Sequence, residues 1–378
     1  MSIKKEIKKV VYLLKNKINA SKYKKAKELY FNQNYTNTKR LIIFFVPSGS
    51  NRISGGILSI CSIYRIVKNL KQLHNSDVIA SYLPNKKDDD FKYRTFENEM
   101  IIYNFHEIEA TFLNLEYLQI HVPEIMVSVF KDKEAKLKSF YEFIKKIKTT
   151  ELNILNQNDL FMPSLDHINF LKSKFNSATI TVAHKKYATL EKREKYNLPL
   201  HLLSPWLNPV PYKVRSYEEK ENLIIYSPDK IQWIPNETLL TKNEIIKNLE
   251  SKLPNYLFKE IKDLKYDDYK ELASKAKFSI TFGEGLDGYF TETVFSGGIS
   301  FAVYNEYFFS EEFKNLETLF YSFNDLSEKI VNKIKSLDNK AEFDKVHQKI
   351  GNIVNKIYSL NHLENDLKEY YTKKYDFE

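Results

Sequence analysis

Runs of consecutive apolar residues alternate along the chain with stretches of helical periodicity. The first run, Leu41–Val46, contains no polar residue. Such unbroken apolarity predicts a strand covered on both faces, as in a parallel sheet. After the loop Pro47–Gly56, the stretch Ile57–Leu73 places its apolar residues on one helical face. This succession of strand, glycine-containing loop and helix predicts the opening of a Rossmann-like unit.

The same alternation continues to about residue 204, and the clearest helical pattern in it is Lys131–Lys148. Near Pro205–Lys220 the pattern breaks, because three prolines precede a charged run. Prolines followed by charge predict a linker. The strands expected before it are Asp77–Tyr82, Met100–Phe105, Tyr117–Val122, Ala178–Ala183 and Leu200–Ser204.

A second alternation of strands and helices follows the linker, with strands at Leu223–Tyr226 and Phe278–Phe282. Helices are expected at Lys242–Lys252 and at Tyr269–Ala276, the latter capped by Asp268. We therefore expect an α/β protein with two Rossmann-like domains, at 38–210 and 211–345. A helical segment is expected on either side of them, at 1–37 and 346–378.

Glycine is rare, with nine in 378 residues, so its positions are informative. Eight of the nine fall in two clusters that follow apolar strands: Gly49, Gly55 and Gly56, and then Gly283, Gly285, Gly288, Gly297 and Gly298. Glycine lets backbone N–H groups approach a ligand, and a helix N-terminus favours phosphate. Two such loops predict a phosphate-bearing ligand, although tight turns alone also use glycine.

Two glutamates, Glu284 and Glu292, bracket the second glycine-rich loop. The first is expected at a strand end and the second in the first turn of a helix at Thr291–Ser296. A carboxylate at a helix N-terminus is stabilised by the helix dipole, which makes capping the simple explanation for Glu292. A carboxylate also accepts two hydrogen bonds, as paired ribose hydroxyls require.

The spacing Glu-x7-Glu, followed by Ser296-Gly297-Gly298 and the apolar run Ile299–Val303, resembles the donor site of retaining GT-B glycosyltransferases, most closely family 4. Ser54-Gly55-Gly56-Ile57 is similar to the N-terminal glycine loop of that family. The resemblance implies two Rossmann-like domains facing a central cleft. It also implies that Glu284 lies beside the donor sugar, that Glu292 binds the ribose, and that backbone amides of Gly285–Phe290 and Gly55-Gly56 face the diphosphate and sugar.

Further site residues are implied by the same resemblance. His121 and His184 each end an apolar run, where the family has histidines near the donor sugar, although a histidine at a strand end is often only structural. The family's diphosphate-binding Arg and Lys are represented here by Lys230 alone, and Asp287 stands where the family has a glycine. The full set expected to bind the donor is Gly55, Gly56, His184, Lys230, Gly285, Gly288, Tyr289, Phe290, Thr291 and Glu292, with Glu284 and His121 as catalytic residues.

The net charge of +9 is concentrated at the N-terminus, where residues 1–29 hold ten lysines against Glu6 and Glu28. Apolar residues recur there at helical spacing between the lysines, which predicts an amphipathic helix. It either lies on an anionic membrane surface or packs on the protein as a solvated helix. Because the remaining chain is nearly neutral and poor in Arg, we expect no nucleic-acid partner.

The single cysteine, Cys61, excludes a disulfide framework and favours a reducing compartment. No apolar run approaches the ~20 residues that span a bilayer, and the N-terminus lacks signal-peptide features. We expect a cytoplasmic protein, peripheral on the inner face of the membrane if its N-terminus binds there. Asp88-Asp89-Asp90 is expected to be a solvated charge run. Neither a metal nor a cofactor is expected.

The sequence thus predicts a metal-independent, retaining hexosyltransferase that moves a sugar from a nucleotide-diphosphate donor to a hydroxyl. A glycan or lipid-linked acceptor of bacterial surface polysaccharide or lipopolysaccharide biosynthesis fits the basic N-terminus. Two alternatives stay open. An inverting GT-B enzyme of capsule or teichoic-acid type would use His121 or Asp166 as a base. A non-enzymatic protein binding membrane or nucleic acid would depend on residues 1–29 and lose affinity steeply with salt.

Overall fold

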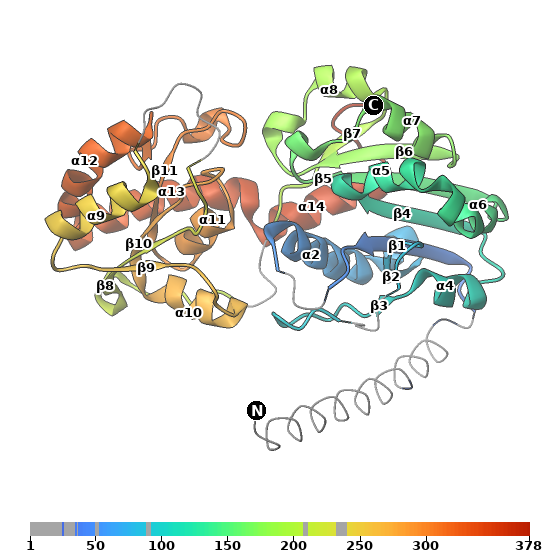
Figure 1. Ribbon diagram of the computed structural model, residues 1–378, viewed down its shortest axis with the longest axis horizontal. Helices are drawn as coiled ribbons and strands as arrows, with labels where there is room; N and C mark the ends of the chain where they lie inside the picture. The colour runs from blue at the N-terminus through green and yellow to red at the C-terminus, as the bar shows by residue number, and fades with distance from the viewer. Residues whose placement is uncertain are drawn as a thin grey trace, which may run out of the picture. The chain divides into compact units, whose positions relative to one another are not determined.

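The structure is a computed structural model that describes residues 25, 35, 37–49, 53–87, 92–206, 211–231 and 240–378. Its described part contains two β-sheets with helices packed on them (Figure 1). Two compact units can be distinguished. The first comprises residues 1–52, 64–94 and 98–181, and the second comprises 53–63, 95–97 and 182–378. The expected α/β class with two Rossmann-like sheets is confirmed.

The first sheet has seven strands in the order β3-β2-β1-β4-β5-β6-β7. Strand β1 pairs in parallel with both β2 and β4, so the strand order reverses beside it. In open α/β sheets, ligands bind outside the carboxyl ends of the strands at such a reversal. The strands are β1 (Arg40–Val46), β2 (Asp77–Tyr82), β3 (Ile102–Tyr103), β4 (Tyr117–Pro123), β5 (Thr149–Asn156), β6 (Ser177–Val182) and β7 (Leu200–Leu202).

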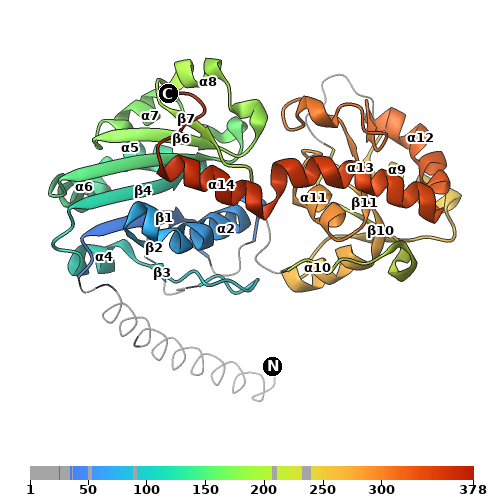
Figure 2. The same ribbon diagram turned by 180° about the vertical axis from the view of Figure 1, so that it is seen from behind.

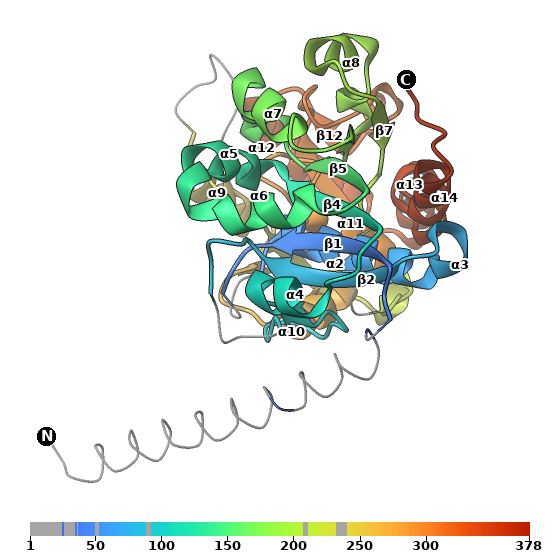
Figure 3. The ribbon, with the colours of Figure 1, turned by 90° about the vertical axis from the view of Figure 1, so that its right-hand side faces the viewer.

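Helices cover both faces of this sheet, with α4 to α7 on one face and α3 on the other (Figure 3). This two-sided cover explains why β1 is apolar throughout, since Leu41–Phe45 are completely buried. The helices are α2 (Gly55–Asn69), α3 (Lys71–His74), α4 (Phe105–Thr111), α5 (Glu124–Asp132), α6 (Lys138–Lys145), α7 (Leu165–Lys172) and α8 (Leu190–Tyr196). Short 3₁₀ helices are η1 (Glu134–Leu137), η2 (Asp159–Phe161) and η3 (Lys185–Tyr187).

Three predictions about the strands and helices of the first sheet need correction. The strand expected at Met100–Phe105 is only Ile102–Tyr103, because Asn104 starts α4 through a capping box with Glu107. The helix expected at Lys131–Lys148 is divided among α5, η1 and α6, since Lys133 has a non-helical backbone. The sequence reasoning missed β5, whose polar residues Glu151 and Asn153 interrupt its apolar pattern.

The second sheet has five strands in the order β12-β11-β10-β8-β9, and every neighbouring pair is parallel. A 3₁₀ helix, η4 (Tyr217–Glu219), precedes its first strand, and η5 (Glu311–Phe313) follows β11. The strands are β8 (Glu221–Tyr226), β9 (Leu257–Glu260), β10 (Ala276–Ile280), β11 (Ile299–Val303) and β12 (Leu319–Phe320). The helices between them are α9 (Lys242–Lys252), α10 (Tyr266–Lys275) and α11 (Gly288–Phe295).

Three helices follow the second sheet: α12 (Phe323–Ser336), α13 (Lys340–Tyr358) and α14 (Leu360–Tyr371). Helix α13 lies over α11 and β11 (Figure 2). Its stripe of Phe343, Val346, Ile350 and Val354 belongs to the same apolar core as Phe278 and Phe301 of the sheet. The helical C-terminus is therefore confirmed as an integral part of the fold.

Two helices of the second sheet start earlier than expected. Helix α10 begins at Tyr266 after Lys265, so Asp268 lies in its first turn and does not cap it. Helix α11 begins at Gly288, capped by Asp287, so Glu292 occupies its second turn. The expected linker also carries structure near its end, because Lys220 is buried just before β8. Among the described residues, no helix is long and apolar enough to cross a bilayer.

Candidate functional site

The glycine-rich loop after β10 has a conformation that requires glycine. Gly285 has a φ of +87°, which residues with a side chain rarely adopt. A Cβ atom there would lie 2.8 Å from the Phe309 ring and 3.0 Å from the Val303 carbonyl oxygen. The Thr281 hydroxyl donates to the Gly285 carbonyl at 2.7 Å and closes the loop. Gly285 is thus explained by local geometry, whatever the loop binds.

Asp287 follows this loop as the N-cap of α11, and its carboxylate accepts the Phe290 N–H at 3.0 Å. In the sequence, Asp287 stood out because the family has a glycine at this position. The structure gives it a capping role. Burial raises the pKa of Asp287 well above its usual range, and the charges of Asp229 and Glu284 raise it further. A proton on Asp287 would remove the repulsion between this group and a bound diphosphate.

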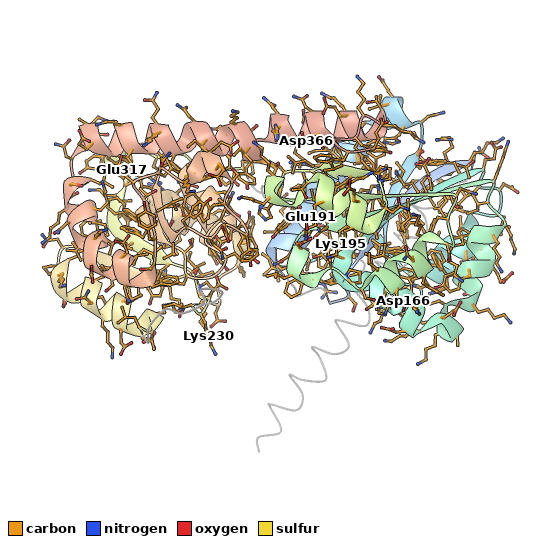
Figure 4. The ribbon with its side chains drawn as sticks, turned by 90° about the horizontal axis from the view of Figure 1, so that it is seen from above. Asp166, Glu191, Lys195, Lys230, Glu317 and Asp366 are labelled. Carbon is orange, nitrogen blue, oxygen red and sulfur yellow. The ribbon has the colours of Figure 1, made fainter. Side chains whose placement is uncertain are left out.

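The loop after β8 contacts the loop after β10. The Ser227 hydroxyl accepts the Phe282 N–H at 3.0 Å, and a Cβ atom on Gly283 would lie 3.1 Å from that of Asp229. Lys230 follows in this loop and is exposed at the surface (Figure 4). The two loops that were expected to bind the donor in this domain are therefore adjacent.

Lys242 is a second cation beside the β8 loop, and the sequence reasoning missed it. Its Nζ donates to the carbonyls of Pro228 and Ser227 at 2.9 and 3.3 Å, and lies 2.7 Å from the Glu260 carboxylate. The sequence contained a pattern that could have located it: Thr241 and Glu244 form a capping box, which fixes Lys242 at the start of α9. Lys242 sets the position of the loop that carries Lys230.

Glu292 is almost completely buried, with 2% of its surface exposed. The Tyr266 hydroxyl lies 3.1 Å from each of its carboxylate oxygens, and the Lys270 Nζ lies 3.5 Å from Oε2. Burial raises the pKa of Glu292 to about 7, although Lys270 and Tyr266 act in the opposite direction. Glu292 therefore changes its charge within the physiological pH range.

The other residues expected around this loop differ in what they face. Phe290 is completely buried in the apolar core, against Phe309 and Phe313, so its role is packing. Tyr289 is half-buried, with its ring 5.6 Å from that of Tyr269. The Thr291 hydroxyl donates a hydrogen bond to the Asp287 carbonyl, and Glu284 and Gly288 are half-buried. Of these residues Phe290 alone is completely buried, whereas the others are half-buried.

His121 lies inside β4, which continues to Pro123, and not at the strand end where it was expected. Its ring is completely buried and stacks on Phe44 with ring centres 4.2 Å apart. The side-chain amide of Asn153 donates through Nδ2 to His121 Nδ1 at 3.0 Å, while Asn153 Oδ1 accepts from the Thr179 hydroxyl at 3.0 Å. Burial lowers the pKa of His121 to about 3, so the ring is neutral at physiological pH.

Glu124 is a buried carboxyl group that the sequence reasoning missed, directly after β4. Burial raises its pKa to about 7, and it accepts the Gln157 N–H at 3.3 Å, which ties the start of α5 to the segment after β5. Gly55 and Gly56 begin α2, the first helix after β1 along the chain, and Ser54 caps that helix through the Ile57 N–H at 3.3 Å. These groups follow neighbouring strands of the first sheet.

His184 belongs to the second unit and is mostly buried. Its Nδ1 lies 3.4 Å from the Tyr358 hydroxyl, and its ring packs against Tyr187 and Phe308. Burial lowers its pKa to about 4. These contacts explain His184 by packing.

Asp166, the alternative base of an inverting enzyme, is exposed on α7 (Figure 4) and forms an ion pair with Lys131. The hydrogen bond from Lys131 lowers the pKa of Asp166, which makes this carboxylate a weak base. Within the described ranges, no group of three or more His, Cys, Asp or Glu residues could hold a metal ion. Asp88-Asp89-Asp90 and most of residues 1–29 lie outside those ranges.

No family model and no curated protein sequence matches the chain. Solved structures do match its fold. An alpha-glucosyltransferase in complex with UDP is 12% identical, with a TM-score of 0.52 over 88% of this chain and 99% of that one. HepE from Anabaena, in complex with UDP and glucose, is 9% identical, with a TM-score of 0.51 over 89% and 100%. Sucrose-phosphate synthase from Thermosynechococcus elongatus is 9% identical, with a TM-score of 0.53 over 88% and 98%.

These are glycosyltransferases of the GT-B fold, matched over nearly their whole length. The chain has the GT-B fold. At this level of identity the likeness concerns the fold, and the residues of the candidate site are assigned on chemistry alone.

Proposed function

We propose that the protein is a nucleotide-sugar glycosyltransferase whose donor is held by the loops after β8 and β10 and by α11. The observation that carries this proposal is the position of Glu284 and Glu292 around the Gly285 loop, on a fold shared with proteins solved with UDP. A loop fixed by glycine and followed by a helix N-terminus suits a diphosphate.

Each group of this site has a proposed role. Glu292 binds the ribose hydroxyls of the donor, and Glu284 orients the transferred sugar. Backbone amides at the start of α11 and the exposed Lys230 stabilise the negative charge of the departing diphosphate by preorganised electrostatics. His121 of β4 and the backbone amides of Gly55 and Gly56, at the start of α2, are proposed to contact the sugar and the diphosphate.

We further propose that transfer retains the anomeric configuration and needs no metal. The acceptor hydroxyl would attack the face from which the diphosphate leaves. A bond then forms between the acceptor oxygen and the anomeric carbon, the bond from that carbon to the phosphate oxygen breaks, and the hydroxyl proton passes to the diphosphate. In the inverting alternative an enzymatic base is required. Asp166, exposed and paired with Lys131, is poorly suited to that role.

For the acceptor, we propose a hydroxyl of a glycan or lipid-linked glycan of a bacterial surface polymer. The basic segment 1–29 is compatible with a protein that works at the inner face of the cytoplasmic membrane. Vesicles of anionic and of neutral lipid, mixed with the full chain and sedimented, test this part separately.

A thermal-shift screen against UDP, GDP, dTDP and CMP, with and without magnesium, tests the donor site. We expect one nucleoside diphosphate to raise the melting temperature without magnesium, and Glu292→Ala to abolish the shift. A matched control is Glu191→Ala, which removes an exposed carboxylate on α8 (Figure 4) and should leave the shift intact. If no nucleotide stabilises the wild type at millimolar concentration, the donor assignment is wrong.

A further inference from the structure

Helix α10 presents two side chains to the buried Glu292 carboxylate. Tyr266 and Lys270 are four residues apart and therefore lie on one helical face. The Tyr266 hydroxyl is equidistant from both carboxylate oxygens at 3.1 Å, and Lys270 lies 3.5 Å from Oε2. All three side chains are nearly inaccessible to solvent. Together they form a polar cluster that ordinary capping of α11 does not require.

Tyr212 supplies a third side of this enclosure. The Lys270 ammonium lies 3.0 Å from the centre of the Tyr212 ring, a close cation–π contact. Burial lowers the pKa of Lys270 to about 8, while the charge of Glu292 raises it. A buried ion pair adds little net stability, because desolvation offsets its attraction. Packing alone therefore gives no reason for the cluster.

The contacts with Tyr266 and Lys270 do not use every hydrogen-bonding position of the carboxylate. An ionised carboxylate has about four lone-pair positions, and Tyr266 and Lys270 together supply two donors. The positions that remain match the two adjacent hydroxyl groups of a ribose. Small rotations of the Glu292 side chain would move its two carboxylate oxygens out of reach of the ribose hydroxyls. A fixed orientation is therefore valuable at this position.

We propose that Tyr266 and Lys270 are positioning residues, which orient the Glu292 carboxylate for the two ribose hydroxyls of the nucleotide donor and favour its ionised form. This inference rests on the donor site proposed above. Neither residue contacts the reacting atoms, and both act through Glu292.

Calorimetric titration of the full chain with UDP and with 2′,3′-dideoxy-UDP tests the proposal, with GDP and its dideoxy analogue titrated in parallel. The ratio of the two affinities measures the contribution of the ribose hydroxyls. For the wild type we expect a ratio of about 10 to 100, the value of hydrogen bonds to a charged group. Tyr266→Phe and Glu292→Gln should each reduce this ratio at least several-fold, with little change in affinity for the dideoxy nucleotide.

Tyr269→Phe is the matched control, since it removes one hydroxyl from the same helix. Tyr269 is also buried, its ring lies 6.0 Å from that of Tyr266, and among the residues that the structure describes its hydroxyl has no hydrogen-bond partner. The ratio of the two affinities measured for Tyr269→Phe should equal that of the wild type. Lys270→Arg keeps the charge and should retain most of the ratio, whereas Lys270→Met should lose it. Circular dichroism verifies that each variant is folded.

The outcomes separate the two proposals. If neither UDP nor GDP binds the wild type, the donor site and this inference both fail. If a nucleotide binds but Glu292→Gln keeps the full ratio, Glu292 does not hold the ribose and nothing remains to be positioned. If Glu292→Gln lowers the ratio and Tyr266→Phe behaves as Tyr269→Phe does, the donor site stands and the positioning role is refuted. A purely structural role of Tyr266 would lower both affinities equally and leave the ratio unchanged.

Discussion

Lys220 offers a direct test of how the second unit is held together. The sequence places it at the end of a linker, yet it is 7% exposed and its Nζ donates to the carbonyls of Ser274 and Ser296 at 2.9 and 3.0 Å. These carbonyls lie at the C-terminal ends of α10 and α11, where helix carbonyls lack intrahelical donors. One ammonium group therefore caps both helices that build the Glu292 cluster.

We expect Lys220→Met to lower the free energy of unfolding by about 2 kcal/mol. Each carbonyl left buried without a partner costs about 1–3 kcal/mol. Ser296 keeps the Arg215 N–H at 3.3 Å, so most of this cost arises at Ser274. Methionine retains the aliphatic contacts of the lysine stem. Lys252→Met, an exposed change at the end of α9, is the control and should cost less than about 0.5 kcal/mol.

The effect of Lys220→Met should also depend on pH. Burial, with a contribution from Arg215, lowers the pKa of Lys220 from 10.5 to about 7. Above pH 7 the unfolded chain then binds a proton that the folded chain has lost, so the contribution of Lys220 to stability increases with pH. Urea denaturation followed by circular dichroism should show a loss about 2 kcal/mol larger at pH 9 than at pH 7. An equal loss at both pH values would refute the reasoning from burial.

Two further predictions concern the candidate site. Because the pKa of Glu292 is raised to about 7, its ionised fraction grows as pH rises from 6 to 8. UDP affinity, measured by calorimetry, should increase up to about tenfold over this range. The increase should be absent in Glu292→Gln. Gly285→Ala should destabilise the protein by about 2 kcal/mol and abolish the nucleotide thermal shift, because of its positive φ and the 2.8 Å contact with Phe309. On α13, nothing lies within 4 Å of a Cβ atom added to Gly351, so Gly351→Ala should instead stabilise the protein by up to about 1 kcal/mol in the same unfolding assay. Similar effects of the two substitutions would contradict the conclusion that the conformation of Gly285 requires glycine.

The fold was predictable where local pattern and burial agree. Strand β1 is apolar because helices cover both faces of its sheet, and its limits differ from the expected ones by a single residue. Strand β5 was missed because Glu151 and Asn153 give it a polar pattern, and Asn153 is buried in the hydrogen-bond network of His121. A buried polar residue of this kind is satisfied by tertiary contacts, which periodicity does not contain.

The candidate site shows the same division. Gly285 could be identified from the sequence because a positive φ is adopted mainly by glycine. The surroundings of Glu292 could not be predicted, since Tyr266 and Lys270 come from α10, whose start was placed three residues too late. With the helix expected at Tyr269–Ala276, Tyr266 lay outside it.

The start of α11 changes the electrostatic argument for Glu292. In the first turn of a helix, the dipole would have kept this carboxylate ionised. Since α11 begins at Gly288, the N-terminal position belongs to Asp287, which takes the capping hydrogen bond from Phe290. The dipole effect falls off within one turn, so the charge of Glu292 depends on the ammonium of Lys270 and the hydroxyl of Tyr266. The ionisation of this carboxylate is thus a property of how α10 packs against α11, which is why we expect substitutions on α10 to alter nucleotide binding.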